Sequence, residues 1–138
     1  MHRRALVVAA VAVAVAAGCS SGNTGTVTGG IIPCAALGYS GEPHYAAGTV
    51  TVLEGQVHWR STGPGTSEEV LPTTVVVGEQ VGVDASYDFV LGPGDYVLRA
   101  RFPPPAITAP SVSMIEPWVS VTVHAGQTEH IDIPNMCI

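Results

Sequence analysis

The sequence predicts a single all-β domain, a β-sandwich of seven to eight strands, and three observations support this prediction. From Gly48 onward, β-branched and aromatic residues alternate with polar ones at the period of two that strands require. Turn signals rich in Gly and Pro recur roughly every eight to twelve residues. After the first 18 residues, no stretch of 11 residues free of Pro and Gly shows helical periodicity, so helices are not expected.

Composition and charge argue against charge-rich disorder and against nucleic-acid binding. The chain has 138 residues, of which 46% are apolar and only 12% are charged, against about 25% in an average protein. Its formal net charge is −6, because 5 arginines and no lysine face 11 acidic residues. A nucleic-acid partner would require clustered cations to meet its phosphates. The length fits one domain.

The first 19 residues indicate export and lipid anchoring. Arg3 and Arg4 precede an unbroken apolar run over residues 5–17, which spans about 20 Å as a helix and is too short for the ~30 Å hydrocarbon core of a membrane. This pattern is typical of a secretory signal peptide. Ala16-Ala17-Gly18-Cys19 resembles a bacterial lipobox, which implies cleavage before Cys19 and a diacylglycerol on its sulfur. An ordinary signal peptide with an incidental cysteine, or a buried N-terminal strand, are the alternatives.

This interpretation divides the chain into three parts. Residues 1–18 are the signal peptide, residues 19–30 are the lipidated cysteine and a flexible linker, and residues 31–138 are the sandwich domain. The linker assignment follows from the Ser, Gly, Thr and Asn content of residues 20–30, which gives a reach of about 18 Å. Removal of residues 1–18 leaves 3 arginines and 11 acids, so the mature net charge is −8. The alanine-rich, lysine-free composition resembles secreted lipoproteins of high-GC actinobacteria.

Two cysteines remain after Cys19 is acylated. In an exported protein, an even number of remaining cysteines indicates a disulfide. Cys34 and Cys137 lie near the two ends of the expected domain, with 102 residues between them. In the chain-entropy model, a loop of this length gives up to about 4.7 kcal/mol of stabilisation. Two free thiols or a redox pair are the alternatives, although the chain contains no C-x-x-C motif.

The strands are expected in the following order. Residues 48–52 and 57–60 alternate in polarity around Glu54-Gly55 and predict a first hairpin. Residues 61–72 contain Gly63, Pro64, Gly65 and Pro72 and predict a loop. The remaining candidates are residues 74–77 and 80–84 around Gly78-Glu79, then residues 87–91, 96–102, 119–123 and 131–133.

Two of these segments resemble a known family. Residues 87–100, with an aromatic strand, a Pro93-Gly94 turn and a Tyr-x-Leu strand, look like the hairpin of transthyretin-like, carboxypeptidase-regulatory-like domains. Residues 119–133, with their turn at Ala125-Gly126-Gln127-Thr128, are similar to the closing hairpin of that family. The resemblance implies an immunoglobulin- or transthyretin-like sandwich that serves as a non-catalytic adhesive or scaffolding module. Fold analogy alone does not establish function.

A long Pro-rich insert, residues 103–117, offers a possible partner surface. Insertions of this length without regular structure are commonly functional. Its apolar and proline residues, together with the tryptophan that follows, either dock a partner or fold down to cover the open edge of the sandwich. The candidate residues for this surface are Pro103, Pro104, Ile107, Met114, Ile115 and Trp118.

Other polar residues suggest weaker alternatives. His124 and His130 flank one turn close to Glu129 and Asp132, so a surface metal or small-ligand site is conceivable, although a metal site requires further ligands. Arg99 and Arg101 either pair with Asp88 on the preceding strand or bind an anion.

Catalytic motifs are absent from the sequence. The adjacent Glu68 and Glu69 are expected to be solvated in a loop, and no Gly-x-Ser-x-Gly motif, catalytic cysteine pattern or phosphate-binding loop occurs. No cofactor and no catalytic residue is therefore predicted. The sequence favours a lipid-anchored, non-enzymatic module on the extracytoplasmic face of the cell membrane that binds an envelope protein or glycan.

Overall fold

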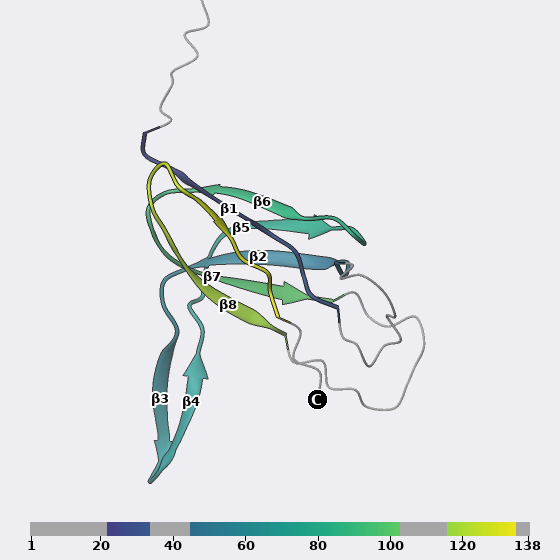
Figure 1. The fold of residues 1–138 in the computed structure, drawn as a ribbon. Coiled ribbons are helices and arrows are strands. Elements are labelled where there is room, and N and C mark those ends of the chain that lie inside the picture. The colour runs from purple at the N-terminus through teal and green to yellow at the C-terminus, as the bar shows by residue number, and fades with distance from the viewer. Residues whose placement is uncertain (1–21, 34–44, 103–115, 135–138) are drawn as a thin grey trace, which may run out of the picture.

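A computed structural model describes residues 22–33, 45–102 and 116–134 of the chain. The described residues form nine strands and no helix, which confirms the predicted all-β class (Figure 1). The strands are β1 (Gly25–Gly29), β2 (Gly48–Glu54), β3 (His58–Gly63), β4 (Thr66–Val70), β5 (Thr74–Val81), β6 (Tyr87–Leu91), β7 (Gly94–Arg101), β8 (Trp118–Val123) and β9 (Thr128–His130). In this part of the chain there is accordingly no helix long and apolar enough to span a membrane.

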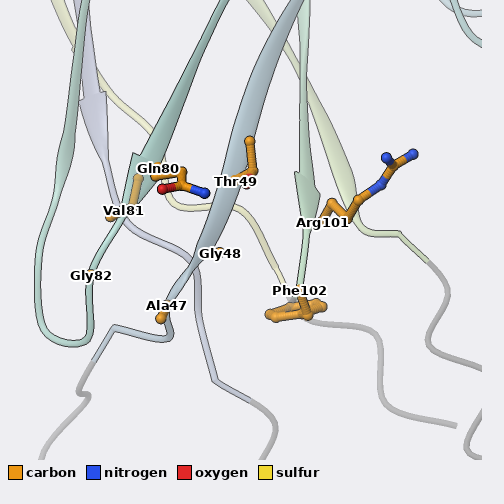
Figure 2. A pocket seen from close by; sticks show the side chains of 8 residues that line it. All are labelled: Ala47, Gly48, Thr49, Gln80, Val81, Gly82, Arg101 and Phe102. Carbon is orange, nitrogen blue, oxygen red and sulfur yellow. The ribbon is translucent and has the colours of Figure 1, made fainter. Parts of the chain in front are cut away.

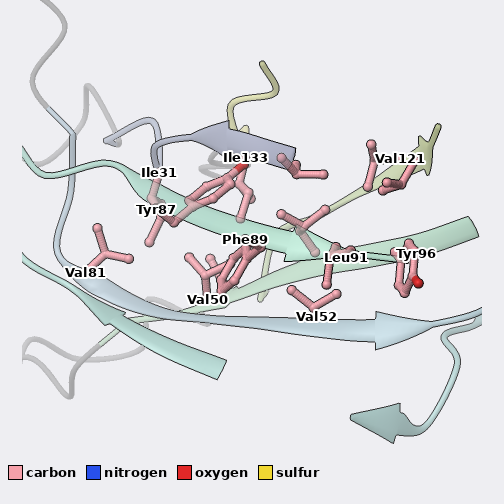
Figure 3. Close-up of a cluster of buried hydrophobic side chains, with 14 of the residues drawn as sticks. Ile31, Val50, Val52, Val81, Tyr87, Phe89, Leu91, Tyr96, Val121 and Ile133 are labelled. Carbon is pink, nitrogen blue, oxygen red and sulfur yellow. The ribbon is translucent and has the colours of Figure 1, made fainter. Parts of the chain in front are cut away.

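Seven strands make a sandwich of two sheets. A three-stranded sheet has the order β6-β1-β9, and a four-stranded sheet has the order β5-β2-β7-β8. Apolar side chains from both sheets meet between them, as Figure 3 shows. Along β6 the burial alternates strictly, because every second side chain of a strand points to the same face. The core includes Val27, Ile31, Val50, Val52, Tyr87, Phe89, Leu91, Tyr96, Leu98, Val121, Val123 and Ile133.

Part of the segment expected to be a flexible linker forms strand β1. Residues 25–29 lie in the middle of the three-stranded sheet, antiparallel to β6 and parallel to β9. Val27 is fully buried between these neighbours. The prediction that residues 19–30 form a flexible linker is therefore wrong for residues 25–30, because Thr26 and Thr28, which resemble linker residues, form the outer side of a strand whose inner side is core.

Strand partners also differ from the predicted first hairpin. β2 does not pair with β3 but lies between β5 and β7, both antiparallel to it. β3 turns instead onto β4 in a separate two-stranded hairpin. The prediction of a loop over residues 61–72 is thus wrong for most of its length. The two strands expected around Gly78-Glu79 are one continuous strand, β5.

The two segments that resemble transthyretin-like domains cross between the sheets. β6 belongs to the three-stranded sheet and β7 to the four-stranded sheet, so the Pro93-Gly94 turn does not close a hydrogen-bonded hairpin. β8 and β9 are divided between the sheets in the same way. The family resemblance itself stays a prediction.

One end of the sandwich gathers several chain connections. Gly25, the first residue of β1, pairs with Leu91, the last residue of β6. At the same end Gly94 pairs with Val123, and Glu54 pairs with Tyr96. The β3–β4 hairpin, which we call the arm (residues 58–70), therefore leaves the body at the end where β1 begins, and it projects away from both sheets (Figure 1).

Candidate partner-binding site at the base of the arm

The arm is a two-stranded hairpin that no strand of the described sandwich joins. Its residues are exposed apart from Gly63 and Val70, which are partly buried. Pro64 and Gly65 form its turn, with Gly65 in the left-handed region at a φ of 74°. An isolated hairpin is at best marginally stable in water. Because its residues are exposed along both strands, both faces of the arm are accessible for contact with another molecule.

The register of the arm assigns its side chains to two faces. On one face Arg60 lies opposite Glu68, and the Arg60 Nε donates to the Glu68 Oε1 at 2.7 Å. On the other face Trp59 lies opposite Glu69, with Ser61 opposite Ser67. We call this second face the arm platform (Trp59, Ser61, Ser67 and Glu69). Trp59 remains 66% exposed, so its ring is a large apolar surface beside a carboxylate and two hydroxyls.

A groove of about 300 Å³ lies beside the base of the arm. The chain entering the arm forms one wall, and β7 together with the edge strand β8 forms the other. Tyr96 and Val121 point into the core, so their neighbours Asp95, Ser120 and Thr122 lie on the outer face of the four-stranded sheet. We call this the base groove; its lining residues are Gly55, Gln56, Val57, Asp95, Tyr96, Ser120, Val121 and Thr122.

Asp95 connects the two walls of the base groove. Its Oδ2 accepts a hydrogen bond from the Gln56 Nε2 at 2.6 Å, and its Oδ1 accepts one from the Thr122 hydroxyl at 2.7 Å. Its backbone carbonyl accepts from the Gly55 amide at 2.9 Å. The hydrogen bonds from Thr122 and Gln56 lower the pKa of the Asp95 carboxyl, with a smaller contribution from nearby His124. Asp95 is thus an ionised acceptor at neutral pH that also orients the root of the arm.

Of the partner surface predicted around the Pro-rich insert, the structure describes Trp118 alone. Pro103, Pro104, Ile107, Met114 and Ile115 lie outside the described residues. Trp118 is half-buried and pairs with Arg99, on the same outer face as Ser120 and Thr122. The base groove therefore lies between an exposed tryptophan on the arm and a half-buried tryptophan on the sheet.

A larger hollow, of about 630 Å³, is at the opposite end of the sandwich (Figure 2). It is bounded by the ends of β2, β5 and β7, including Thr49, Gln80 and Phe102. The one charged side chain in its lining is Arg101, which is bound to Glu116 at 2.6 Å. The described residues that line this hollow include no group of titratable side chains that would suggest chemistry.

The two candidate metal ligands have separate partners. His124 lies near Asp95 at the end of β8, whereas His130 is in β9 of the other sheet. The His130 Nδ1 is 3.2 Å from the Thr28 hydroxyl, and its Nε2 is 3.5 Å from the Asp132 Oδ1. Asp132 in turn accepts from the Gly30 amide at 2.9 Å. These contacts join β1 to the segment around β9, and the described residues contain no group of three His, Cys, Asp or Glu arranged to hold a metal.

The charged residues singled out in the sequence also have partners other than those expected. Arg99 and Arg101 both bind Glu116, at 3.4 and 2.6 Å, and not Asp88, because β6 and β7 belong to different sheets. Glu68 and Glu69 lie in β4 and not in a loop, and they point to opposite faces of the arm. The two arginines are consequently not a free anion-binding pair.

Sequence reasoning did not find the arm platform or the base groove. The available signal was the Pro64-Gly65 turn between two short polar segments, residues 58–63 and 66–70. The partnership between Gln56 and Asp95, 39 residues apart, had no signal in a single sequence. Compared with protein-family models, curated protein sequences and solved structures, the chain gives no match.

The lipid-attachment and disulfide predictions fall outside the described residues. Cys19, Cys34 and Cys137 all belong to segments of which the structure describes nothing. Two described segments stop shortly before a cysteine in the sequence, at Pro33 before Cys34 and at Pro134 before Cys137. Ile31 forms a parallel bridge with Ile133, and the Ile32 amide donates to the Ile133 carbonyl at 3.0 Å.

Proposed function

We propose that this protein is a lipid-anchored, non-enzymatic module on the extracytoplasmic face of the membrane, which holds an envelope protein or glycan at its arm. The observation that supports this most is the exposed Trp59 on a hairpin that projects from the sandwich (Figure 1). Tryptophan is enriched at binding surfaces because it buries a large area with little loss of conformational entropy. An unsupported hairpin gains stability by binding, which favours an interaction role for it.

The shared end of the arm and of β1 adds a spatial constraint. Gly25 follows Cys19 by six residues, which span at most about 20 Å when extended. A lipid on Cys19 would therefore keep the arm end of the sandwich close to the bilayer. The proposed partner is one that lies within the membrane-proximal layer of the envelope.

Crosslinking on intact cells tests the function. The full chain and its Trp59→Ala variant are expressed at equal levels, crosslinked and analysed by mass spectrometry. We expect the variant to lose most of the crosslinked partner that the parent chain captures, because the aromatic contact is gone. Val90→Ala is the matched control, since Val90 is 67% exposed and lies in β6 of the three-stranded sheet, to which the arm does not belong.

Two results would contradict the proposal. A crosslinked set that is the same for Trp59→Ala and for the parent chain would exclude the arm as the binding element. Intact-mass measurement of the exported protein tests the anchor separately, and an unmodified N-terminus at Met1 would exclude lipidation at Cys19.

A further inference from the structure

We propose that the base groove and the arm platform together bind a neutral oligosaccharide. This inference rests on the proposed function and specifies the chemistry of its ligand. It depends on three properties of the described residues: the mixture of donors and acceptors in the groove, the position of Trp59 relative to it, and the pairing of the surrounding charges.

The polar groups of the base groove suit hydroxyl-rich ligands. A sugar hydroxyl both donates and accepts, so its site needs acceptors and donors close together. Asp95 supplies carboxylate acceptor sites beyond the two used by Gln56 and Thr122, since a carboxylate has about four. The amide of Gln56 and the hydroxyls of Ser120 and Thr122 add groups of both kinds. A groove of about 300 Å³ is at the small end of ligand sites, which fits one sugar ring and not a protein segment.

Trp59 extends the site along the arm. Val57 lines the groove just before β3 begins at His58, and Trp59 is the second residue of β3, two residues further along the chain. The distance along a strand over two residues is about 6.6 Å. A second sugar ring would then place its C–H face on the exposed indole while its hydroxyls meet Glu69 across the hairpin. The ligand is accordingly an oligosaccharide and not a single sugar.

The charges near the site favour a neutral ligand. Asp95 and Glu69 are acidic, and the formal charge of the chain is −6, so uronic acids and phosphorylated sugars are repelled. The nearest arginines do not offset this, because Arg60 is bound to Glu68 and Arg99 is bound to Glu116. The same charges disfavour adsorption of the arm to an anionic lipid surface.

Calorimetric titration of the full chain in detergent micelles tests the inference. The probes are cellotetraose and maltotetraose, which are neutral glucose tetramers with β and α linkages, and tetragalacturonic acid as the anionic control. We expect at least one neutral tetramer to bind, with Trp59→Ala and Asp95→Asn each weakening its affinity by about tenfold or more, a change typical of a central contact. Trp59→Phe should retain affinity within about threefold because it keeps a ring, and Val90→Ala should bind like the parent chain.

Circular dichroism of each variant establishes that it is folded before titration. No heat from either neutral tetramer at about 10 mM, or equal binding by Trp59→Ala and the parent chain, would overturn the saccharide inference. Stronger binding of tetragalacturonic acid would overturn it as well. If the crosslinked partner of intact cells still depends on Trp59 in that case, the partner is a protein and the proposed function stands without its saccharide.

Discussion

Tyr87 connects the core to the chain that follows β9. Its side chain is fully buried, and its ring stacks on Phe89 with the centroids 5.4 Å apart. Its hydroxyl donates to the Ile131 carbonyl, 44 residues away in sequence. Burial raises the pKa of the Tyr87 phenol, and the nearby Asp132 carboxylate raises it further. The folded chain therefore keeps Tyr87 protonated at pH values where an exposed tyrosine ionises.

This arrangement predicts alkaline destabilisation that depends on Tyr87. Above pH 10.0, the unfolded chain loses the phenolic proton and the folded chain retains it, so the free energy of unfolding falls as the pH rises. Tyr87→Phe should lower stability by about 1–2 kcal/mol at pH 7, because the Ile131 carbonyl loses a buried donor. It should also flatten the alkaline slope. Urea unfolding between pH 7 and 11 measures both effects, and an unchanged slope in the variant would contradict the assignment to Tyr87.

Single glycines show why the sequence misplaced the start of the domain. A Cβ on Gly29 would overlap the Ile131 backbone, and one on Gly30 would overlap the Tyr45 ring. Gly29 leaves room for the backbone that follows β9, and Gly30 leaves room for the Tyr45 ring, yet in a sequence both look the same as glycines of a flexible linker. Alternating burial in residues 25–29 becomes visible only once β6 and β9 are known on either side.

At the scale of elements, the arm should be separable from the sandwich. Glu54 pairs with Thr74, and a Cβ on Gly55 would lie 3.2 Å from the Pro72 Cβ, so the two ends of the hairpin are adjacent. Replacement of residues 58–70 by Gly-Gly should leave the thermal midpoint within about 3 °C, because the arm contributes no side chain to the core cluster. Thermal unfolding followed by circular dichroism measures this. A large drop in the midpoint would mean that the arm supports the sandwich.

The strand partners of this region illustrate the limit of sequence patterns. The alternation of residues 48–52 correctly predicts a strand, and the turn signal at Glu54-Gly55 coincides with the end of that strand. The predicted pairing of this strand with the next one along the chain is wrong, because the Gly55 amide donates to the Asp95 carbonyl and the chain leaves the sheet at that point. Local polarity predicts that a strand exists and which side is buried. It does not indicate which of several strands pairs with it, because pairing depends on residues far along the chain.

At the scale of the whole molecule, the first and last strands of the described residues run side by side. β1 and β9 are parallel, and Ile31 pairs with Ile133 in the same direction. The sequence-based expectation of a disulfide between these two ends of the domain stays a prediction. Cys34 comes directly after Pro33, and Cys137 comes three residues after Pro134. The segments that carry them continue from Pro33 and Pro134, which follow the paired Ile31 and Ile133 by at most two residues.

A disulfide between Cys34 and Cys137 should therefore be a main source of stability. The loop it closes contains 102 residues, for which the chain-entropy model gives up to about 4.7 kcal/mol, and losses of about 2–5 kcal/mol are typical when such a bond is removed. Cys34→Ser, Cys137→Ser and the double variant should each lose a similar amount in urea unfolding, since one missing sulfur breaks the bond. The parent chain should lose the same amount in a reducing agent, whereas the double variant should not respond to it. Two thiols that react with an alkylating agent in the exported, unreduced protein would show that no such bond forms, and the parallel strands β1 and β9 alone would then hold the ends together.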